Sequence, residues 1–181
     1  MASLVSISDS NSLLQAGSHC EVCPDPILEL SPLTSPQVKN ATSKSTNFAW
    51  FQWVPQAAAQ HLDNFPVTPG DWLQITIFML STTNARVTIA NQSKGMQRSI
   101  AAFNGSALIG VEPAWIVQTP VINGGKSWFP QYDGMWMTEA SCTLNDNTNL
   151  GIMGSTQWQV EGQCKSIEFN NTVVEMDQYD A

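Results

Sequence analysis

The sequence predicts an all-β protein: one domain, residues 1–181, folded as an antiparallel sandwich of two sheets. Apolar residues alternate with polar ones at a period of two along most of the apolar segments. Short polar turns rich in Gly, Asn and Pro separate these segments. Many short strands at regular spacing are typical of sandwiches and barrels, and 181 residues suffice to bury the core of one domain.

The expected strands follow from five segments. Residues 48–54 are a dense aromatic run that ends at Pro55, and residues 71–80 are rich in β-branched residues. Apolar and polar residues alternate in the other three segments, 86–90, 135–140 and 157–160. Turn signals stand between them at Pro69-Gly70, Asn104-Gly105, Asn123-Gly124-Gly125 and Glu161-Gly162. A helix is expected only briefly, at 55–62.

One segment breaks the pattern. Residues 24–46 hold four prolines followed by a Ser/Thr/Lys/Asn stretch, which predicts an irregular insertion of about 20 residues. Insertions of this length inside compact domains are usually lids, binding loops or disordered segments. All three remain open for this one.

Composition excludes several classes of function. The formal net charge is −8 and no basic run occurs, so we expect no nucleic-acid partner. No run of about 18 apolar residues occurs, so we expect no membrane span. Residues 1–10 lack the pattern of a signal peptide, which predicts an intracellular protein as the chain stands, or a secreted one if a leader is missing.

The cysteines do not form a metal motif. Cys20-x-x-Cys23 has neither a second Cys pair nor a His pair nearby. We therefore expect no metal site and no cofactor, and loop thiols are the plain interpretation of this pair.

Six motifs in order resemble those of the fungal glutamic peptidases (eqolisins, peptidase family G1). Residues 13–17 resemble the ILQTG strand of that family, and 47–55 resemble its YDAWYEWYP strand. The remaining four matches are 69–77, 85–95, 114–118 and 128–142. The resemblance runs from about residue 6 to the C-terminus and implies a sandwich of two bent sheets, concanavalin-like or jelly-roll-like, with a groove on one concave face. The family's first strands have no counterpart, so the sandwich is expected to be shortened at its N-terminus. A homodimer or the 24–46 insertion can then cover the exposed sheet edge.

The resemblance also implies a catalytic pair, of which this chain keeps one member. The family hydrolyses peptides with a Gln that stabilises the oxyanion and a Glu that acts as general base. The Gln position is Gln15, but the Glu position is Ala114. Glu112 lies two residues earlier and shares a strand face with Ala114, unless Pro113 forces a bulge.

Other positions of the family groove are also changed. The resemblance places His19 where the family has an Asp, and Gln52 where it has a Glu. Alternation puts Trp50 and Gln52 on one face of their strand and Phe51 and Trp53 on the other. We expect Trp50, Trp53 and Trp115 to supply aromatic walls to the groove, while His61 reads as a solvated residue.

A further expectation concerns the remaining cysteines. Cys142 and Cys164 fall near cysteine positions of the family, and the resemblance implies that they lie close enough to bridge. Cys20 and Cys23 are expected to stay apart from that pair.

Three functions compete. In the first, the groove acts on a small organic molecule by cyclisation, isomerisation, dehydration or hydrolysis, without a cofactor, in fungal biosynthesis. Gln15 and Glu112 would be catalytic, and His19, Trp50, Gln52, Trp53, Ala114 and Trp115 would contact the substrate. In the second, the chain remains an acid endopeptidase that uses Gln15 and a displaced Glu112. In the third, it is an inactive pseudoenzyme or a ligand-binding module.

Overall fold

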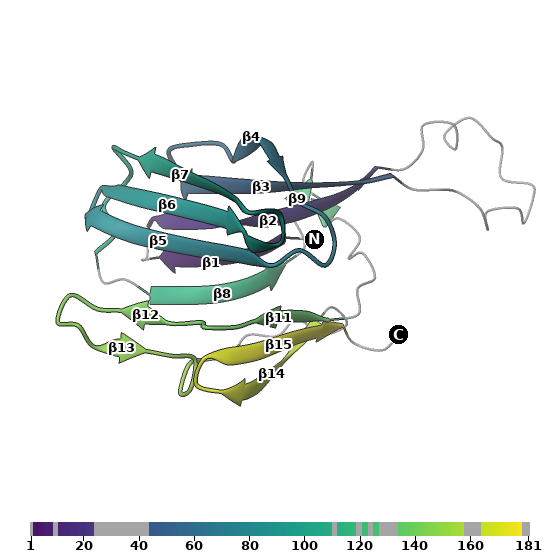
Figure 1. Ribbon diagram of the computed structural model, residues 1–181. Helices are drawn as coiled ribbons and strands as arrows, with labels where there is room; N and C mark the ends of the chain where they lie inside the picture. Colours follow the sequence, from purple (N-terminus) through teal and green to yellow (C-terminus); the bar gives the residue numbers. More distant parts are fainter. Residues whose placement is uncertain are drawn as a thin grey trace, which may run out of the picture.

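The computed structural model is almost entirely β (Figure 1). It describes residues 2–8, 11–23, 44–109, 112–118, 121–122, 125–126, 134–157 and 164–178. Within these ranges the helical structure is one 3-10 turn, η3 (Gln92–Lys94), and every strand pair is antiparallel. The predicted all-β antiparallel fold is confirmed.

The largest sheet has five strands in the order β4-β3-β2-β1-β8. Their bounds are β1 Ala2–Ser8, β2 Leu13–Cys23, β3 Lys44–Val54, β4 Gln60–Pro66 and β8 Glu112–Gln118. A three-stranded meander joins β5 Leu73–Ser81, β6 Asn84–Asn91 and β7 Met96–Ala102. A second three-stranded sheet has the order β11-β15-β14, with bounds Met135–Met137, Val173–Gln178 and Cys164–Asn170. Two short pairs complete the fold: β9 Val121–Ile122 with β10 Gly125–Lys126, and β12 Cys142–Thr143 with β13 Asn149–Leu150.

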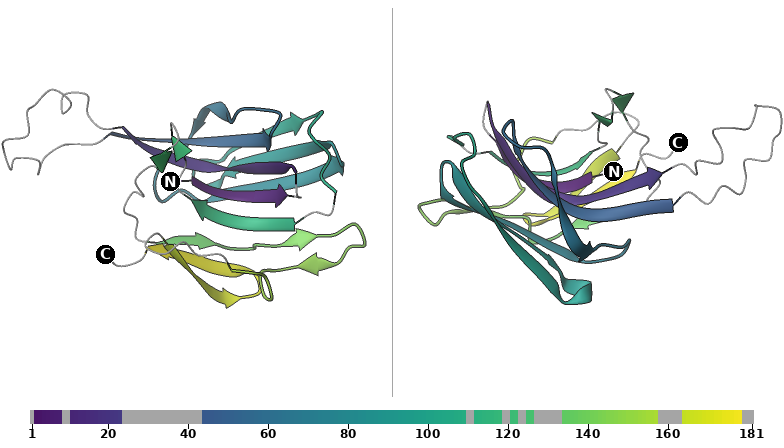
Figure 2. Two further views of the ribbon diagram at one scale, coloured as in Figure 1. Left: turned by 180° about the vertical axis from the view of Figure 1, so that it is seen from behind. Right: turned by 90° about the horizontal axis from the view of Figure 1, so that it is seen from above.

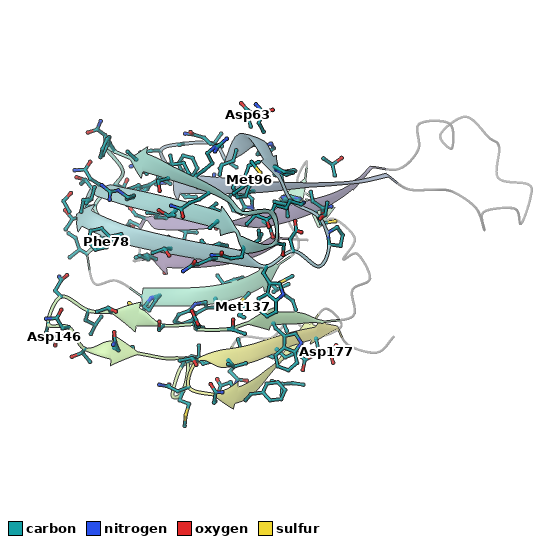
Figure 3. The ribbon with its side chains drawn as sticks, viewed as in Figure 1. Asp63, Phe78, Met96, Met137, Asp146 and Asp177 are labelled. Carbon is teal, nitrogen blue, oxygen red and sulfur yellow. The ribbon has the colours of Figure 1, made fainter. Side chains whose placement is uncertain are left out.

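The meander β5–β7 covers one face of the five-stranded sheet (Figures 1 and 2). Alternate residues of β2 and β3 point to it, and they meet the fully buried Val87 and Ile89 of β6. On the other side of the meander, Phe78 is 59% exposed, as period-2 alternation requires (Figure 3). This buried layer is the main core, and it leaves the opposite face of the five-stranded sheet for other uses.

Trp53 belongs to this core. Its indole Nε1 donates to the carbonyl oxygen of Ser106 at 3.2 Å, and the side chain is 4% exposed. Gly105 makes room for the ring, because a Cβ at this position would overlap the indole. The turn signal at Asn104-Gly105 is thus confirmed, and its glycine is required by packing.

A second core lies between β8 and the β11-β15-β14 sheet. Ala140, Ile152 and Val174 are buried there, and Trp115 of β8 and Met137 of β11 pack against them (Figure 3 labels Met137). Trp115 therefore contributes its ring to the packing of the sandwich.

A buried polar network closes the turn before β5. Asp71 N donates to Thr68 O at 3.1 Å and Gly70 has φ +85°, the geometry of a type II turn with Pro69 at its second position. The carboxylate of Asp71 accepts from Lys94 Nζ and from the fully buried Asn91, each at 2.8 Å. The ion pair with Lys94 holds the pKa of Asp71 far below its ordinary value.

One local expectation was wrong, and one about the cysteines stays untested. Residues 55–62 form a turn that leads into β4 rather than a helix. Cys142 carries a free thiol, and burial raises the pKa of that thiol. That Cys142 and Cys164 lie close enough to bridge stays a prediction.

The last three residues of the range predicted for the insertion, 44–46, belong to a strand, because β3 begins at Lys44, which pairs with Cys23. Residues 24–43 lie outside the described residues, as do the turns predicted at 123–124 and 161–162. The segment 157–160 lies outside them beyond Gln157.

The Asp71 network makes stability depend on acid pH. A carboxyl whose pKa is lower in the folded chain stabilises the fold above the unfolded pKa of about 4 and loses this contribution as pH falls. We predict that Asp71→Asn lowers the free energy of unfolding at pH 6, and that its gap to the wild type narrows steadily toward pH 2. Urea unfolding across this range measures the gap. Asp63→Asn, which removes an exposed carboxylate on the outward bulge of β4 (Figure 3), is the control. A gap that stays constant with pH would contradict the assignment.

Candidate functional site

The centre of the five-stranded sheet places Gln15 and Ala114 in one row. β1 pairs with both β2 and β8, and its Ser6 stands opposite Gln15 on one side and Ala114 on the other. Gln15 in turn stands opposite Gln52 of β3. Residues directly opposite one another share a sheet face, so Gln52, Gln15, Ser6 and Ala114 form a continuous row. We call the face that carries it the glutamine face; the other face of the sheet is the one covered by β5–β7.

The two glutamines are joined by a chain of amide hydrogen bonds. Gln15 Nε2 donates to Gln52 Oε1 at 2.9 Å, and Gln52 Nε2 donates to the carbonyl oxygen of Ala57 at 3.0 Å. Gln15 is only 8% exposed, so its amide is held in place in a nearly dry environment. An amide in this position can donate and accept hydrogen bonds, but it cannot remove a proton from water.

The next row shows that the glutamine face is concave. Trp50 of β3 stands opposite Gly17 of β2. On β1, Leu4 stands opposite Gly17 on one side and opposite Ile116 of β8 on the other. Trp50 packs against Ile116, although β3 and β8 are three strand spacings apart, about 14 Å in a flat sheet. The sheet must bend for these side chains to meet, and Gly17, next to Trp50 in this row, adds no side chain of its own.

A stack of three rings continues the face beyond Trp50. His19 stands opposite Phe48, and their ring centroids lie 4.9 Å apart. The ring of His61 stacks on the other side of Phe48 at 3.9 Å. A bulge in β4 makes this contact possible. Between the pairs Phe48–Pro66 and Trp50–His61, β3 has one residue and β4 has four, 62–65.

Glu112 lies on the glutamine face but outside the row. The register runs unbroken from Ala114 through Pro113, which faces Ile7, to Glu112, which faces Ser8, so Pro113 causes no bulge. Strand spacing places the Cα atoms of Glu112 and Gln15 roughly 12 Å apart in a flat sheet. The side chain of Glu112 is exposed to solvent at the margin of the glutamine face, where Glu112 stands opposite Ser8.

The structure therefore brings together part of the predicted site. Gln15, Gln52, Trp50, His19 and Ala114 share the glutamine face with Glu112 at its margin. Trp53 and Trp115 lie on the opposite face in the two cores, so the expectation that they line the groove was wrong. The site residues that sequence reasoning missed are Ser6, Gly17, Phe48, His61 and Ile116.

The described side chains of this face carry amide, aromatic and imidazole groups. No carboxylate occurs in the Gln52–Gln15–Ser6–Ala114 row. In the part of the chain that the structure describes, no group of three or more His, Cys, Asp or Glu side chains could hold a metal ion. No helix among those same residues is long and apolar enough to cross a membrane. Among the residues of this face whose side chains the structure describes, the groups that can exchange a proton are the imidazoles of His19 and His61 and, at the margin, the carboxyl of Glu112.

Comparison with known proteins identifies the family. A family model described as the Peptidase A4 family matches residues 7–179, nearly the whole chain. The chain therefore belongs to this family, and the resemblance to the glutamic peptidases is confirmed. Among curated proteins, no sequence matches.

Solved structures of glutamic peptidases share the fold. Aspergilloglutamic peptidase from Aspergillus niger superposes with a TM-score of 0.76 at 17% identity, covering 98% of this chain and 97% of that one. Scytalido-glutamic peptidase, bound to a transition-state analogue inhibitor, gives 0.67 at 17% identity over 98% and 82% of the two chains. SCP-B, an eqolisin in complex with the tripeptide Ala-Ile-His, gives 0.64 at 16% identity over 98% and 81%. At these identities the likeness establishes the β-sandwich fold and says nothing of activity.

The amide chain of the row is testable by a double-mutant cycle. Gln52→Met removes the acceptor of Gln15 and leaves a buried amide without its partner, so we predict a loss of about 1–3 kcal/mol in the free energy of unfolding. Gln15→Met/Gln52→Met replaces both partners by apolar side chains of similar shape and should lose less than the sum of the two single variants. Chemical denaturation measures all four proteins, and strictly additive losses would show that the two amides do not interact.

Proposed function

We propose that this chain is a non-proteolytic member of the glutamic peptidase family whose glutamine face binds and converts a small organic molecule. The observation that carries the proposal is the content of the row: Gln52, Gln15, Ser6 and Ala114 include no group that can act as a general base. Peptide hydrolysis at this row needs such a base to activate water, and losing one typically lowers the rate by about 10²–10⁴-fold.

The lining of the face favours a small organic ligand. Trp50, Phe48 and Ile116 form an apolar cluster on a concave surface, and the Gln15–Gln52 amide pair lies beside it. Sites for small molecules usually combine an apolar lining with a few fixed polar groups. Cyclisation, isomerisation, dehydration or hydrolysis of such a ligand would draw its proton transfers from His19, His61 or Glu112. We further propose that the reaction needs no cofactor and belongs to small-molecule biosynthesis.

One observation favours a second candidate, an acid endopeptidase that uses Gln15 and Glu112. Because Pro113 causes no bulge, Glu112 does face the same side of the sheet as Gln15. Its exposure and its displacement by one residue repeat weigh against a water molecule held between the two side chains. A ligand-binding module without turnover would use the same face and differs only in the absence of a product.

An acid proteolysis assay separates the two candidates. We predict that the wild-type chain leaves a denatured protein substrate intact at pH 2–4, and that Glu112→Gln behaves identically, because no general base stands in the row. Peptide release followed by mass spectrometry is the measurement, and circular dichroism at the same pH confirms that both chains are folded. Cleavage by the wild type that disappears in Glu112→Gln would establish the displaced pair and overturn the proposal.

A further inference from the structure

The indole of Trp50 holds a buried hydrogen-bond donor that nothing in the described residues accepts. Trp50 is 6% exposed, and its Nε1 atom is buried without a hydrogen-bond partner. A buried N–H that loses its partner costs about 1–3 kcal/mol, and native proteins leave few such groups. The other buried indole of the same strand, Trp53, donates to Ser106 O at 3.2 Å. The orphan donor of Trp50 is thus a local feature of the glutamine face.

The surroundings of Trp50 explain why the protein supplies no acceptor. The apolar side chains packed against it are Phe48 and Ile116, and Gly17 opposite it on β2 has no side chain. His61 stands opposite it on β4, where its ring stacks on Phe48. The nearest amides are engaged elsewhere, since Gln15 donates to Gln52 and Gln52 donates to Ala57. A water molecule held there would itself need two to four polar partners, and the side chains of Phe48 and Ile116 offer none.

We infer that the acceptor comes from the ligand, and that the ligand is a neutral molecule with a carbonyl oxygen. This inference rests on the proposed function and adds the chemical class of its substrate. The carbonyl oxygen accepts from Trp50 Nε1, and the apolar body of the molecule lies against Ile116 and over Ala114, where the family's acid is missing. Neutrality follows from charge: the chain carries −8, and the carboxylate at the margin of the face is Glu112, so an anionic ligand would be repelled.

Two probes of nearly equal shape test the hydrogen bond. Acetophenone carries a carbonyl oxygen where α-methylstyrene carries a CH₂ group, and the two are otherwise alike. The indole N–H signals of the ¹⁵N-labelled wild-type protein are assigned through bonds, so the measurement does not depend on a variant that folds. We expect acetophenone to move the Trp50 indole proton downfield, as a new hydrogen bond does, and α-methylstyrene to leave it without a downfield shift.

Variants then distinguish loss of the hydrogen bond to Trp50 from loss of the whole binding site. Trp50→Phe removes the donor together with part of the apolar ring, so it should weaken acetophenone binding by roughly twofold to tenfold more than it weakens α-methylstyrene binding, the value of one hydrogen bond. Trp72→Phe, which alters a 63% exposed indole, is the matched control and should change neither. Ala114→Phe fills the space opposite Gln15 and should weaken both probes.

The outcomes distinguish this inference from the proposed function. If acetophenone does not shift the Trp50 signal up to its limit of solubility, or if both probes shift it equally, the carbonyl assignment is overturned. If Ala114→Phe weakens both probes while Trp50→Phe affects the two probes equally, the small-molecule site stands and only the carbonyl assignment fails. If Ala114→Phe leaves both unchanged, the probes bind away from the glutamine face, which overturns both.

Discussion

The pairing of β1 with two neighbours is the constraint on which the site depends. Because β1 lies between β2 and β8, Ser6 fixes Gln15 and Ala114 opposite one another across a single intervening strand. Side chains alternate with a period of two, so a slip of one residue would turn Gln15 into the core and expose Leu14, which is fully buried. Burial of Leu14 on one side of β2 therefore holds Gln15 on the opposite side. The residues of the site need not contribute to the strand register.

Much of this arrangement could be predicted from sequence, and the reason is the regularity of strands. Alternation correctly separated Trp50 and Gln52 from Phe51 and Trp53, and the family motifs correctly placed Gln15 and Ala114 on one face. Both predictions depend only on period and order, which the sequence carries directly.

The errors and omissions concern features that depend on tertiary context. His61 is exposed, as expected, but its contact with Phe48 was not predicted. The contact exists only because β4 has three more residues than β3 in the bulge, and nothing in the local pattern marks that insertion. Trp115 packs into the second core because β8 borders the β11-β15-β14 sheet, a contact between distant segments. Pro113 left open whether its strand has a bulge or lies at a sheet edge. Only the tertiary structure decides for the edge, since β8 is the last strand of the five-stranded sheet, where a missing N–H is tolerated.

The molecule illustrates how a fold can be kept while a site changes its chemistry. The sandwich is held by two cores and by the Asp71 network, and none of these uses a residue of the Gln52–Gln15–Ser6–Ala114 row. The row can therefore exchange an acid for an alanine without loss of the fold, because function lies in the side chains that the fold presents. Under the proposed function, this concave face of amides and rings, with an indole donor that has no acceptor, binds a neutral ligand and does not activate water.

Restoring acids to the row is the most direct test that its side chains, and not the fold, decide the chemistry. Gln52→Glu/Ala114→Glu places carboxylates on both sides of Gln15 and can be assayed for acid proteolysis beside the wild type at equal protein concentration. The account predicts that peptide release appears in the double variant and is absent from the wild type. Release by the wild type at a rate equal to that of the double variant would contradict it.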